Sequence, residues 1–231
     1  MNAKERYNLW VNDARLDEES RQELTAIAGD EKQIEDRFYK DLEFGTGGLR
    51  GILGAGTNRM NVYTVRRAAA GLGDQLIAEG ADACQKGVAI AHDSRRFSRE
   101  FAEDSARVLA KKGIRVYLFD SLRPTPELSF TIKHLGCAAG IVVTASHNPA
   151  EYNGFKAYGA DGGQITPATA DAVLRRMSEI DPLGVEMMDE AEAKEKGLVS
   201  IIGGEVDDTW FAHRITEPSL TMFSRPITRT G

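Results

Sequence analysis

The chain has 231 residues, a formal net charge of −6 at pH 7, 42% hydrophobic residues and 28% charged residues. This length fits one large domain, or one domain with part of another, and the composition argues against disorder of the whole chain. The acidity is concentrated between Glu179 and Asp208, where ten acidic residues and two lysines lie. Nucleic acids and anionic membranes bind clustered lysine and arginine, so we expect neither as a partner.

Two cysteines, Cys84 and Cys137, are too few for a disulfide framework or a cysteine-rich zinc site. We expect reduced thiols and a cytoplasmic protein, because the first residues are charged and show no signal-peptide pattern. The longest strongly apolar run, from Cys137 to Ala145, is too short to span a bilayer.

The sequence pattern changes near residue 44, from apolar residues at helical spacing to a glycine-rich segment. Apolar residues at roughly helical spacing predict helices through the first forty residues. Phe44 to Gly56 contains six glycines, which favours a loop or a tightly packed strand and turn. Asn61 is expected to cap an amphipathic helix that runs to Glu79.

From residue 87 onward, predicted strands and helices alternate. Strands are predicted at 87–92, 114–119 and 139–144, and helices at 98–112, 125–136 and 166–179. Continuous apolar strands separated by helices predict a three-layer α/β/α fold with a mixed, mostly parallel sheet, preceded by N-terminal helices. Ligands of such sheets bind at the carboxyl ends of strands, so the loops at 93–98, 120–125 and 145–154 are the ones to inspect.

We divide the chain into three parts. Residues 1–42 are expected to be a helical extension, and residues 43–200 the α/β domain. The pattern weakens beyond Asp181-Pro182, and residues 201–231 end without completing an element. We therefore expect 201–231 to be a linker or the truncated start of a second domain.

The segment Thr-Ala-Ser-His-Asn-Pro, residues 144–149, follows directly on a predicted strand. One interpretation makes Ser146 a turn residue, the commonest role of a serine beside Asn-Pro. The other makes it a nucleophile presented at the edge of the sheet. His147 is not expected to activate it as in a serine hydrolase, because neighbours in an extended chain point to opposite sides, and no Gly-x-Ser-x-Gly elbow is present.

A phosphorylated serine at Ser146 fits better than a hydrolase nucleophile. A phosphoserine carries about −1.5 to −2 charges and three acceptor oxygens, which need cations and N–H donors nearby. Arg50, His147 and Lys156, the last in the segment Tyr-Asn-Gly-Phe-Lys, are candidates to supply them.

Two further segments carry polar or glycine-rich patterns. Gly-Thr-Gly-Gly-Leu-Arg-Gly, residues 45–51, suits a phosphate or phosphorylated sugar, with Thr46, Gly47 and Arg50 as candidate contacts; the alternative is close backbone packing. It matches neither the dinucleotide fingerprint nor the P-loop.

The segment His-Asp-Ser-Arg-Arg, residues 92–96, follows another predicted strand. An Asp–Arg pair in such a place is usually structural, but Arg95 or Arg96 can instead help hold the Ser146 loop. No residue spacing makes a self-sufficient metal site.

These segments together resemble the α-D-phosphohexomutase superfamily of phosphoglucomutases and phosphomannomutases. The resemblance covers about Phe44–Glu179 and rests on Thr-Ala-Ser-His-Asn-Pro followed by Tyr-Asn-Gly-Phe-Lys. Phe-Gly-Thr-Gly-Gly-Leu-Arg-Gly is similar to the phosphoglucomutase branch that also includes phosphopentomutases. The resemblance implies that residues 43–200 are domain I of that superfamily, the domain that carries the nucleophile.

The resemblance also implies an activity, that of an intramolecular phosphotransferase (an isomerase) of carbohydrate metabolism. Ser146 would be phosphorylated and pass its phosphoryl group to a sugar 1-phosphate. The resulting sugar bisphosphate would turn around and return its other phosphate, moving phosphate between positions 1 and 6 or 5. Arg50 and Lys156 would lie beside the transferring group, with His147 accompanying the serine and Thr46 and Gly47 contacting substrate.

The resemblance implies a Mg²⁺ ion bound to the phosphate on Ser146, with its other ligands from an Asp-x-Asp-x-Asp loop that these residues lack. The expected partners are a glucose, mannose or pentose phosphate and the missing C-terminal domains, and the chain alone is expected to lack turnover. An alternative is a non-catalytic α/β module that retains the motif in an assembly or regulatory role.

Overall fold

The structure is a computed structural model, and it describes residues 1–45 and 47–216. Its strands are β1 (Phe44–Gly45), β2 (Gly48–Ile52), β3 (Val88–His92), β4 (Val116–Phe119), β5 (Ala139–Val143), β6 (Tyr152–Gly159) and β7 (Val199–Ile202). Its helices are α1 (Ala3–Asn12), α2 (Glu18–Ala26), α3 (Glu31–Phe38), α4 (Val62–Glu79), α5 (Ala81–Lys86), α6 (Ser98–Lys111), α7 (Thr125–Leu135), α8 (Pro167–Ser178), the 3₁₀ helix η1 (Pro182–Gly184), α9 (Glu190–Glu195) and α10 (Gly204–Thr216).

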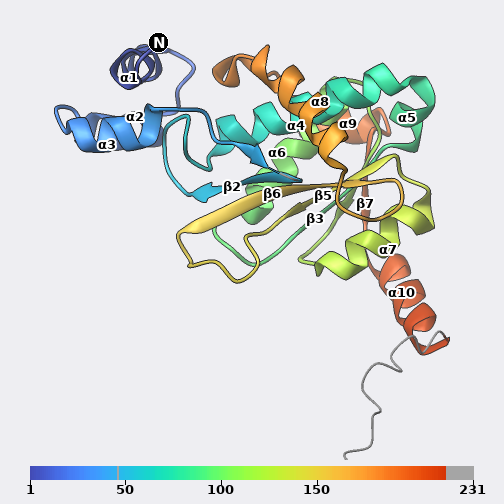
Figure 1. Cartoon of the computed structure of the whole chain (residues 1–231). Coiled ribbons are helices and arrows are strands. Elements are labelled where there is room, and N and C mark those ends of the chain that lie inside the picture. Colours follow the sequence, from blue (N-terminus) through green and yellow to red (C-terminus); the bar gives the residue numbers. More distant parts are fainter. Residues whose placement is uncertain (46, 217–231) are drawn as a thin grey trace, which may run out of the picture.

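The strands form one mixed sheet in the order β1-β2-β6-β5-β3-β4-β7. The neighbours β5, β3, β4 and β7 are parallel, whereas β6 is antiparallel to both β5 and β2. Most strands therefore run in one direction. Helices α4, α6 and α8 lie on one side of the sheet and α7 on the other (Figure 1), which confirms the predicted α/β/α class.

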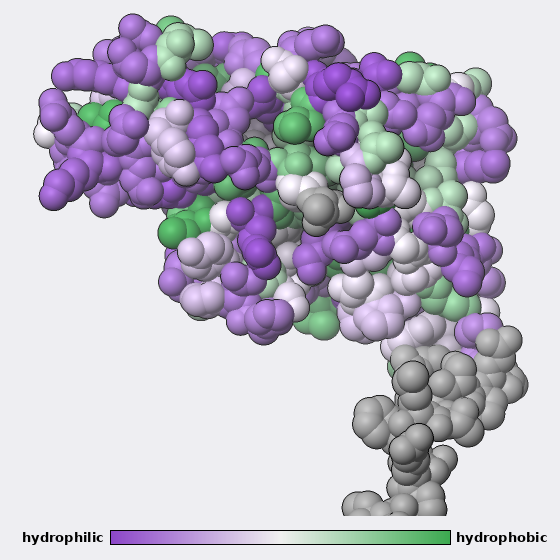
Figure 2. Space-filling model, viewed as in Figure 1, coloured by the Kyte–Doolittle hydropathy of each residue, from purple (hydrophilic) through white to green (hydrophobic). Residues whose placement is uncertain are grey.

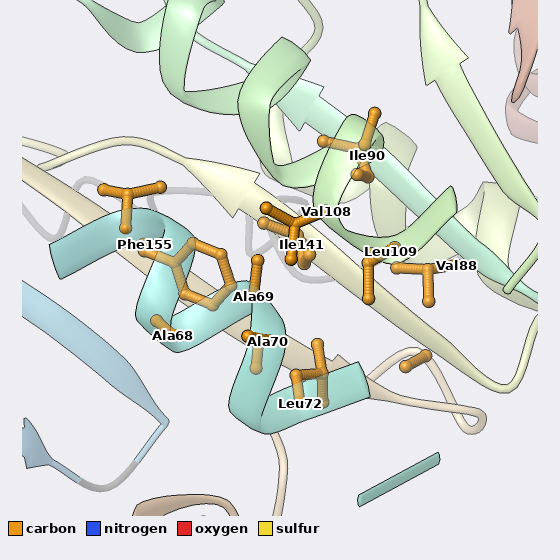
Figure 3. Close-up of a cluster of buried hydrophobic side chains, with 14 of the residues drawn as sticks. Ala68, Ala69, Ala70, Leu72, Val88, Ile90, Val108, Leu109, Ile141 and Phe155 are labelled. Atoms are coloured by element: carbon orange, nitrogen blue, oxygen red, sulfur yellow. The ribbon is translucent and has the colours of Figure 1, made fainter. Parts of the chain in front are cut away.

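Apolar side chains alternate between the two faces of the central strands. Val88 and Ile90 belong to the cluster beneath α4 and α6, while Ala89 and Ala91 belong to the cluster beneath α7. Figure 3 shows how the alanines of α4 let that helix approach the sheet closely beside Phe155. Burying each large apolar side chain contributes about 1.5–3 kcal/mol to the stability of the fold. The packing of helices on both faces therefore fixes the sheet that carries the loops.

The N-terminal helices have their own small core. Trp10 of α1 makes edge-to-face contacts with Phe38 of α3, at 5.8 Å, and with Tyr63 of α4, at 5.5 Å between ring centroids. Tyr63 also hydrogen-bonds Asp17, and burial raises the pKa of its hydroxyl to about 12. The outer surface over α1–α3 is mainly hydrophilic (Figure 2). The aromatic cluster and polar contacts such as the Arg59–Asp36 ion pair join these helices to the domain.

Several predicted element boundaries agree with the structure. Asn61 caps α4, whose last residue is Glu79, and Thr166 caps α8. Ser98, the first residue of the helix predicted at 98–112, is also the first residue of α6, and its hydroxyl donates to Asp93. Strand β6 was not predicted, since Asn153-Gly154 has the composition of a turn.

The C-terminal part of the described chain continues the sheet. Ile201 and Ile202 end β7, which pairs with β4, and Val206 of α10 is buried in the cluster beneath α7. The division of the chain at residue 200 remains a prediction. In the residues that the structure describes, no helix has the length and apolar character needed to cross a membrane.

Candidate active site

Ser146 lies in the loop that follows β5, at the carboxyl end of a central strand. Its backbone is left-handed, with φ of 56°, and its side chain is exposed. Only Phe97 shares a positive φ among the non-glycine residues that the structure describes. A left-handed residue with a Cβ costs about 1–2 kcal/mol, so surrounding contacts must hold Ser146 in place. One is the Thr144 hydroxyl, which accepts from the Ser146 N–H at 3.0 Å.

His147 lies against Ser146. The Ser146 Oγ is 3.3 Å from His147 Nδ1, so the expectation that the two side chains point apart was wrong. That expectation assumed an extended chain, whereas the left-handed turn at Ser146 brings neighbouring side chains together. The structure therefore places an imidazole nitrogen beside the serine hydroxyl.

Lys156 reaches the same site from β6. It pairs with Val142 of β5, the strand that leads into the Ser146 loop. Lys156, Ser146 and His147 line one cavity of about 430 Å³, together with Asp93, Arg123, Pro124, Thr125, Val142 and Thr144. The predicted nucleophile and this predicted cation thus border the same space, although they come from a loop and from the strand that follows it.

Arg50 approaches the loop from β2. Its Nη1 lies 3.3 Å from Oδ1 of Asn148. In the ladder between β2 and β6, Arg50 pairs with Gly154 and Gly48 with Lys156. Residues two apart in a strand share a face, so Arg50 and Lys156 lie on the same side of the sheet.

The described residues of the glycine-rich segment belong to paired strands, since Phe44 pairs with Leu49 and Gly45 with Gly48. Gly48 has φ of 152°, and a Cβ built on it would lie 1.9 Å from the Phe155 carbonyl oxygen. Close backbone packing, the alternative that the sequence left open, therefore explains Gly48. Gly47 lines a second cavity of about 510 Å³ with Arg50 and Lys156. Thr46, the other predicted substrate contact, lies outside the described residues.

Arg95 holds the Ser146 loop through its backbone. Its guanidinium donates to the carbonyl oxygens of Ser146, Asn148, Pro149 and Tyr152 at 2.6–3.0 Å. The sequence pattern left open whether Arg95 is structural or holds this loop; the contacts show that it holds the loop.

Arg123, in the loop before α7, lines the same cavity and belongs to a charged cluster with Glu127 of α7 and Asp207 of α10. Hydrogen bonding to Asp207 raises the pKa of Arg123, which lines the cavity wall. Burial raises the pKa of the neighbouring Glu127 to about 7, and its Oε1 is buried with no hydrogen-bond partner among the described residues. This cluster was missed in the sequence, because its three members come from separate elements.

The geometry agrees with a family model. Residues 41–183 match the model described as phosphoglucomutase/phosphomannomutase, alpha/beta/alpha domain I. The chain belongs to this family. The matched range contains Arg50, Ser146, His147 and Lys156, and it confirms the resemblance drawn from the sequence.

Phosphoglucomutases are among the relatives of this family member. The chain is 43% identical over 153 residues to a phosphoglucomutase of Staphylococcus aureus (strain bovine RF122 / ET3-1), a match that covers 66% of this chain and 27% of that protein. It is 39% identical over 174 residues to a phosphoglucomutase of Staphylococcus saprophyticus, covering 75% and 31%. The chain thus spans less than a third of the length of these relatives.

A solved structure agrees with the family fold. The chain superimposes with a TM-score of 0.63 on a protein provisionally assigned as a phosphomannomutase from Thermus thermophilus, at 29% identity over 77% of this chain and 36% of that one. The family is therefore supported by sequence and by three-dimensional structure.

Proposed function

We propose that this chain is the part of a phosphosugar mutase that carries the phosphorylated serine, and that Ser146 accepts and returns the phosphoryl group. One observation carries the proposal: the exposed Ser146 hydroxyl, in a left-handed turn, borders a cavity that Lys156 and Arg123 also line. Phosphoryl transfer depends mainly on positioning and on neutralising charge on the transferred group, and this site supplies both.

In the proposed step a bond forms between Ser146 Oγ and phosphorus while the bond from phosphorus to a sugar oxygen breaks. The serine proton passes to that sugar oxygen, and His147 Nδ1, 3.3 Å from Oγ, is placed to hold it in transit. Lys156 and Arg50, on one face of the sheet, offset the charge of the phosphoserine. The reverse step returns phosphate to another sugar position through a bisphosphate, which moves phosphate between positions 1 and 6 or 5.

The Mg²⁺ expected from the family resemblance would bind the phosphate on Ser146. Within residues 1–45 and 47–216, no group of three or more His, Cys, Asp or Glu side chains is placed to hold a metal ion. Asp93, the carboxylate that lines the cavity, already accepts hydrogen bonds from the Arg95 N–H and the Ser98 hydroxyl. The described residues therefore do not form a Mg²⁺ site, and the proposed transfer uses only side chains of this chain.

We propose complete phosphosugar mutase turnover only for a longer protein that contains further domains. Because the relatives are longer than this chain, we propose that sugar recognition and turnover need those domains, while this chain alone performs the half-reaction at Ser146. The proposed substrates are glucose, mannose or pentose phosphates, and the cytoplasm remains the proposed location.

The test is phosphorylation of the chain itself. The protein is incubated with ³²P-labelled glucose 1,6-bisphosphate, and its intact mass and label are followed. We expect at most one phosphoryl group per chain, lost in Ser146→Ala and kept in Ser94→Ala, which removes an exposed serine of the neighbouring loop. A chain that never gains phosphate would favour the non-catalytic module instead.

A further inference from the structure

Arg95 joins two loops that are far apart in the sequence. It follows β3 and precedes α6, and its guanidinium contacts the loop between β5 and β6. Nη1 donates to the carbonyl oxygens of Pro149 at 2.8 Å and Tyr152 at 3.0 Å. Nη2 donates to those of Ser146 at 2.9 Å and Asn148 at 2.6 Å. Four N–H groups of one planar fork thus bind the carbonyl groups of the serine and of three residues that follow it.

The fork is itself held in place. Asp93 Oδ1 accepts from the Arg95 backbone N–H at 2.9 Å, and Asp93 Oδ2 lies 3.6 Å from Arg95 Nε. Asp93 also accepts from Ser98, whose hydroxyl oxygen accepts from Asn153 at the start of β6. Only 16% of the Arg95 side chain is exposed, so it has little freedom to release the loop.

These contacts fix the direction of the peptide group after Ser146. Because a peptide unit is planar and trans, a carbonyl that points at Arg95 sends the next N–H the opposite way. The Ser146 carbonyl points at Arg95, so the His147 N–H points away from it. In the part of the chain that the structure describes, no atom accepts a hydrogen bond from this N–H. It remains available to an oxygen of a phosphate on Ser146.

We propose that Arg95 is a positioning residue that keeps Ser146 in its left-handed conformation for phosphoryl transfer. The inference rests on the proposed function, because it concerns the serine that would carry the phosphate. A lysine cannot replace Arg95, since a single ammonium group lacks the planar fork that reaches several carbonyl groups at once. The left-handed turn has an intrinsic cost, so loss of the clamp lets the loop relax to other conformations.

The first arm of the test measures the loop directly by hydrogen–deuterium exchange of the whole chain. Within the loop, the Asn148 and Tyr152 N–H groups are bound to the carbonyl oxygens of Ala145 and Pro149. In Arg95→Lys we expect exchange in peptides covering 146–152 to rise at least 10-fold, with β4 peptides unchanged. Arg99→Met is the matched control, because it removes an exposed arginine of the same region that pairs with Glu103. Unchanged loop exchange in a folded Arg95→Lys would overturn the proposal.

The second arm measures phosphorylation of Ser146 by ³²P-labelled glucose 1,6-bisphosphate at increasing concentrations. We expect the maximal rate in Arg95→Lys to fall 10- to 100-fold, because a misplaced nucleophile loses that much. The half-saturating donor concentration should stay within about twofold, since Arg95 binds the loop and not the donor. A merely structural role would leave the maximal rate of the folded variant unchanged.

The two arms separate the two hypotheses. Wild-type chain that gains phosphate, with Arg95→Lys labelled at the same maximal rate, overturns the positioning role alone. Wild-type chain that gains none overturns the proposed function, and the exchange measurement still decides whether Arg95 holds the loop. Should Arg95→Lys fail to fold, Arg95→Gln, which keeps a planar donor group, takes its place in both arms.

Discussion

The hydroxyl oxygen of Ser146 lies 3.3 Å from Nδ1 of His147, the residue that follows it. A contact of this kind between serine and histidine also occurs in serine hydrolases, where a buried acid orients the imidazole. Here His147 is exposed, and no carboxylate among the described residues forms a hydrogen bond with its ring. We therefore predict that a fluorophosphonate probe leaves Ser146 unlabelled under conditions that label trypsin completely. Stoichiometric labelling that is lost in Ser146→Ala would instead identify a hydrolase.

The charge of Lys156 should affect the rate of Ser146 phosphorylation but not the stability of the fold. Lys156→Gln removes the half-buried cation that shares a cavity with Ser146, and we expect the rate of Ser146 phosphorylation to fall about 10- to 1000-fold. The melting temperature should change by no more than about 2 °C. Lys86→Gln is the matched control, because Lys86 is 54% exposed and pairs with Asp82 on α5. Equal rates in both variants would remove Lys156 from the site.

Gly154 should be required for the fold. A Cβ at this position would lie 2.7 Å from the Thr144 carbonyl oxygen and 3.0 Å from that of Leu49. Both are backbone atoms, one in β2 and one in the residue that follows β5, so Gly154→Ala should lower the free energy of unfolding by about 2–4 kcal/mol. Gly204→Ala, whose Cβ would meet nothing within 4 Å, should change it by less than about 1 kcal/mol. Urea unfolding monitored by circular dichroism measures both, and equal stabilities would contradict the described packing of β2, β6 and β5.

Glu127 should make stability depend on pH. Burial raises the pKa of its carboxyl group from 4.5 to about 7, so the folded state holds a proton that the unfolded state releases. Between about pH 5 and pH 8 the free energy of unfolding should therefore fall as pH rises, by about 2–3 kcal/mol from this group. Glu127→Gln, whose amide does not titrate, should remove that part of the decline. Parallel pH profiles of wild type and variant would contradict the assignment.

Much of the fold follows from local sequence patterns. Strands β3, β4 and β5 consist mainly of consecutive apolar residues that are buried. Asn61 and Thr166 are helix N-caps that mark the starts of α4 and α8. Strand β6 could not be found in this way. Its Asn153-Gly154 has turn composition, yet Gly154 is there because two neighbouring strands approach closely.

The sequence named candidate residues for the site but not how they lie together, and their roles remain a proposal. The sequence named Arg50, Ser146 and Lys156, and the sheet register brings their strands together. The left-handed turn at Ser146 could not be predicted, because a serine rarely adopts it without tertiary contacts. Those contacts come from the Thr144 hydroxyl and from Arg95, whose four carbonyl partners lie more than fifty residues away and have no sequence pattern of their own.

The central claim is that the phosphoryl group resides on Ser146. Tandem mass spectrometry of the peptide that contains both Thr144 and Ser146 tests it most directly, after incubation of the chain with glucose 1,6-bisphosphate. We predict phosphate on Ser146 alone, because its hydroxyl is exposed whereas Thr144 is buried and its hydroxyl accepts from the Ser146 N–H. Phosphate on Thr144, or an unmodified peptide after prolonged incubation, would contradict this claim.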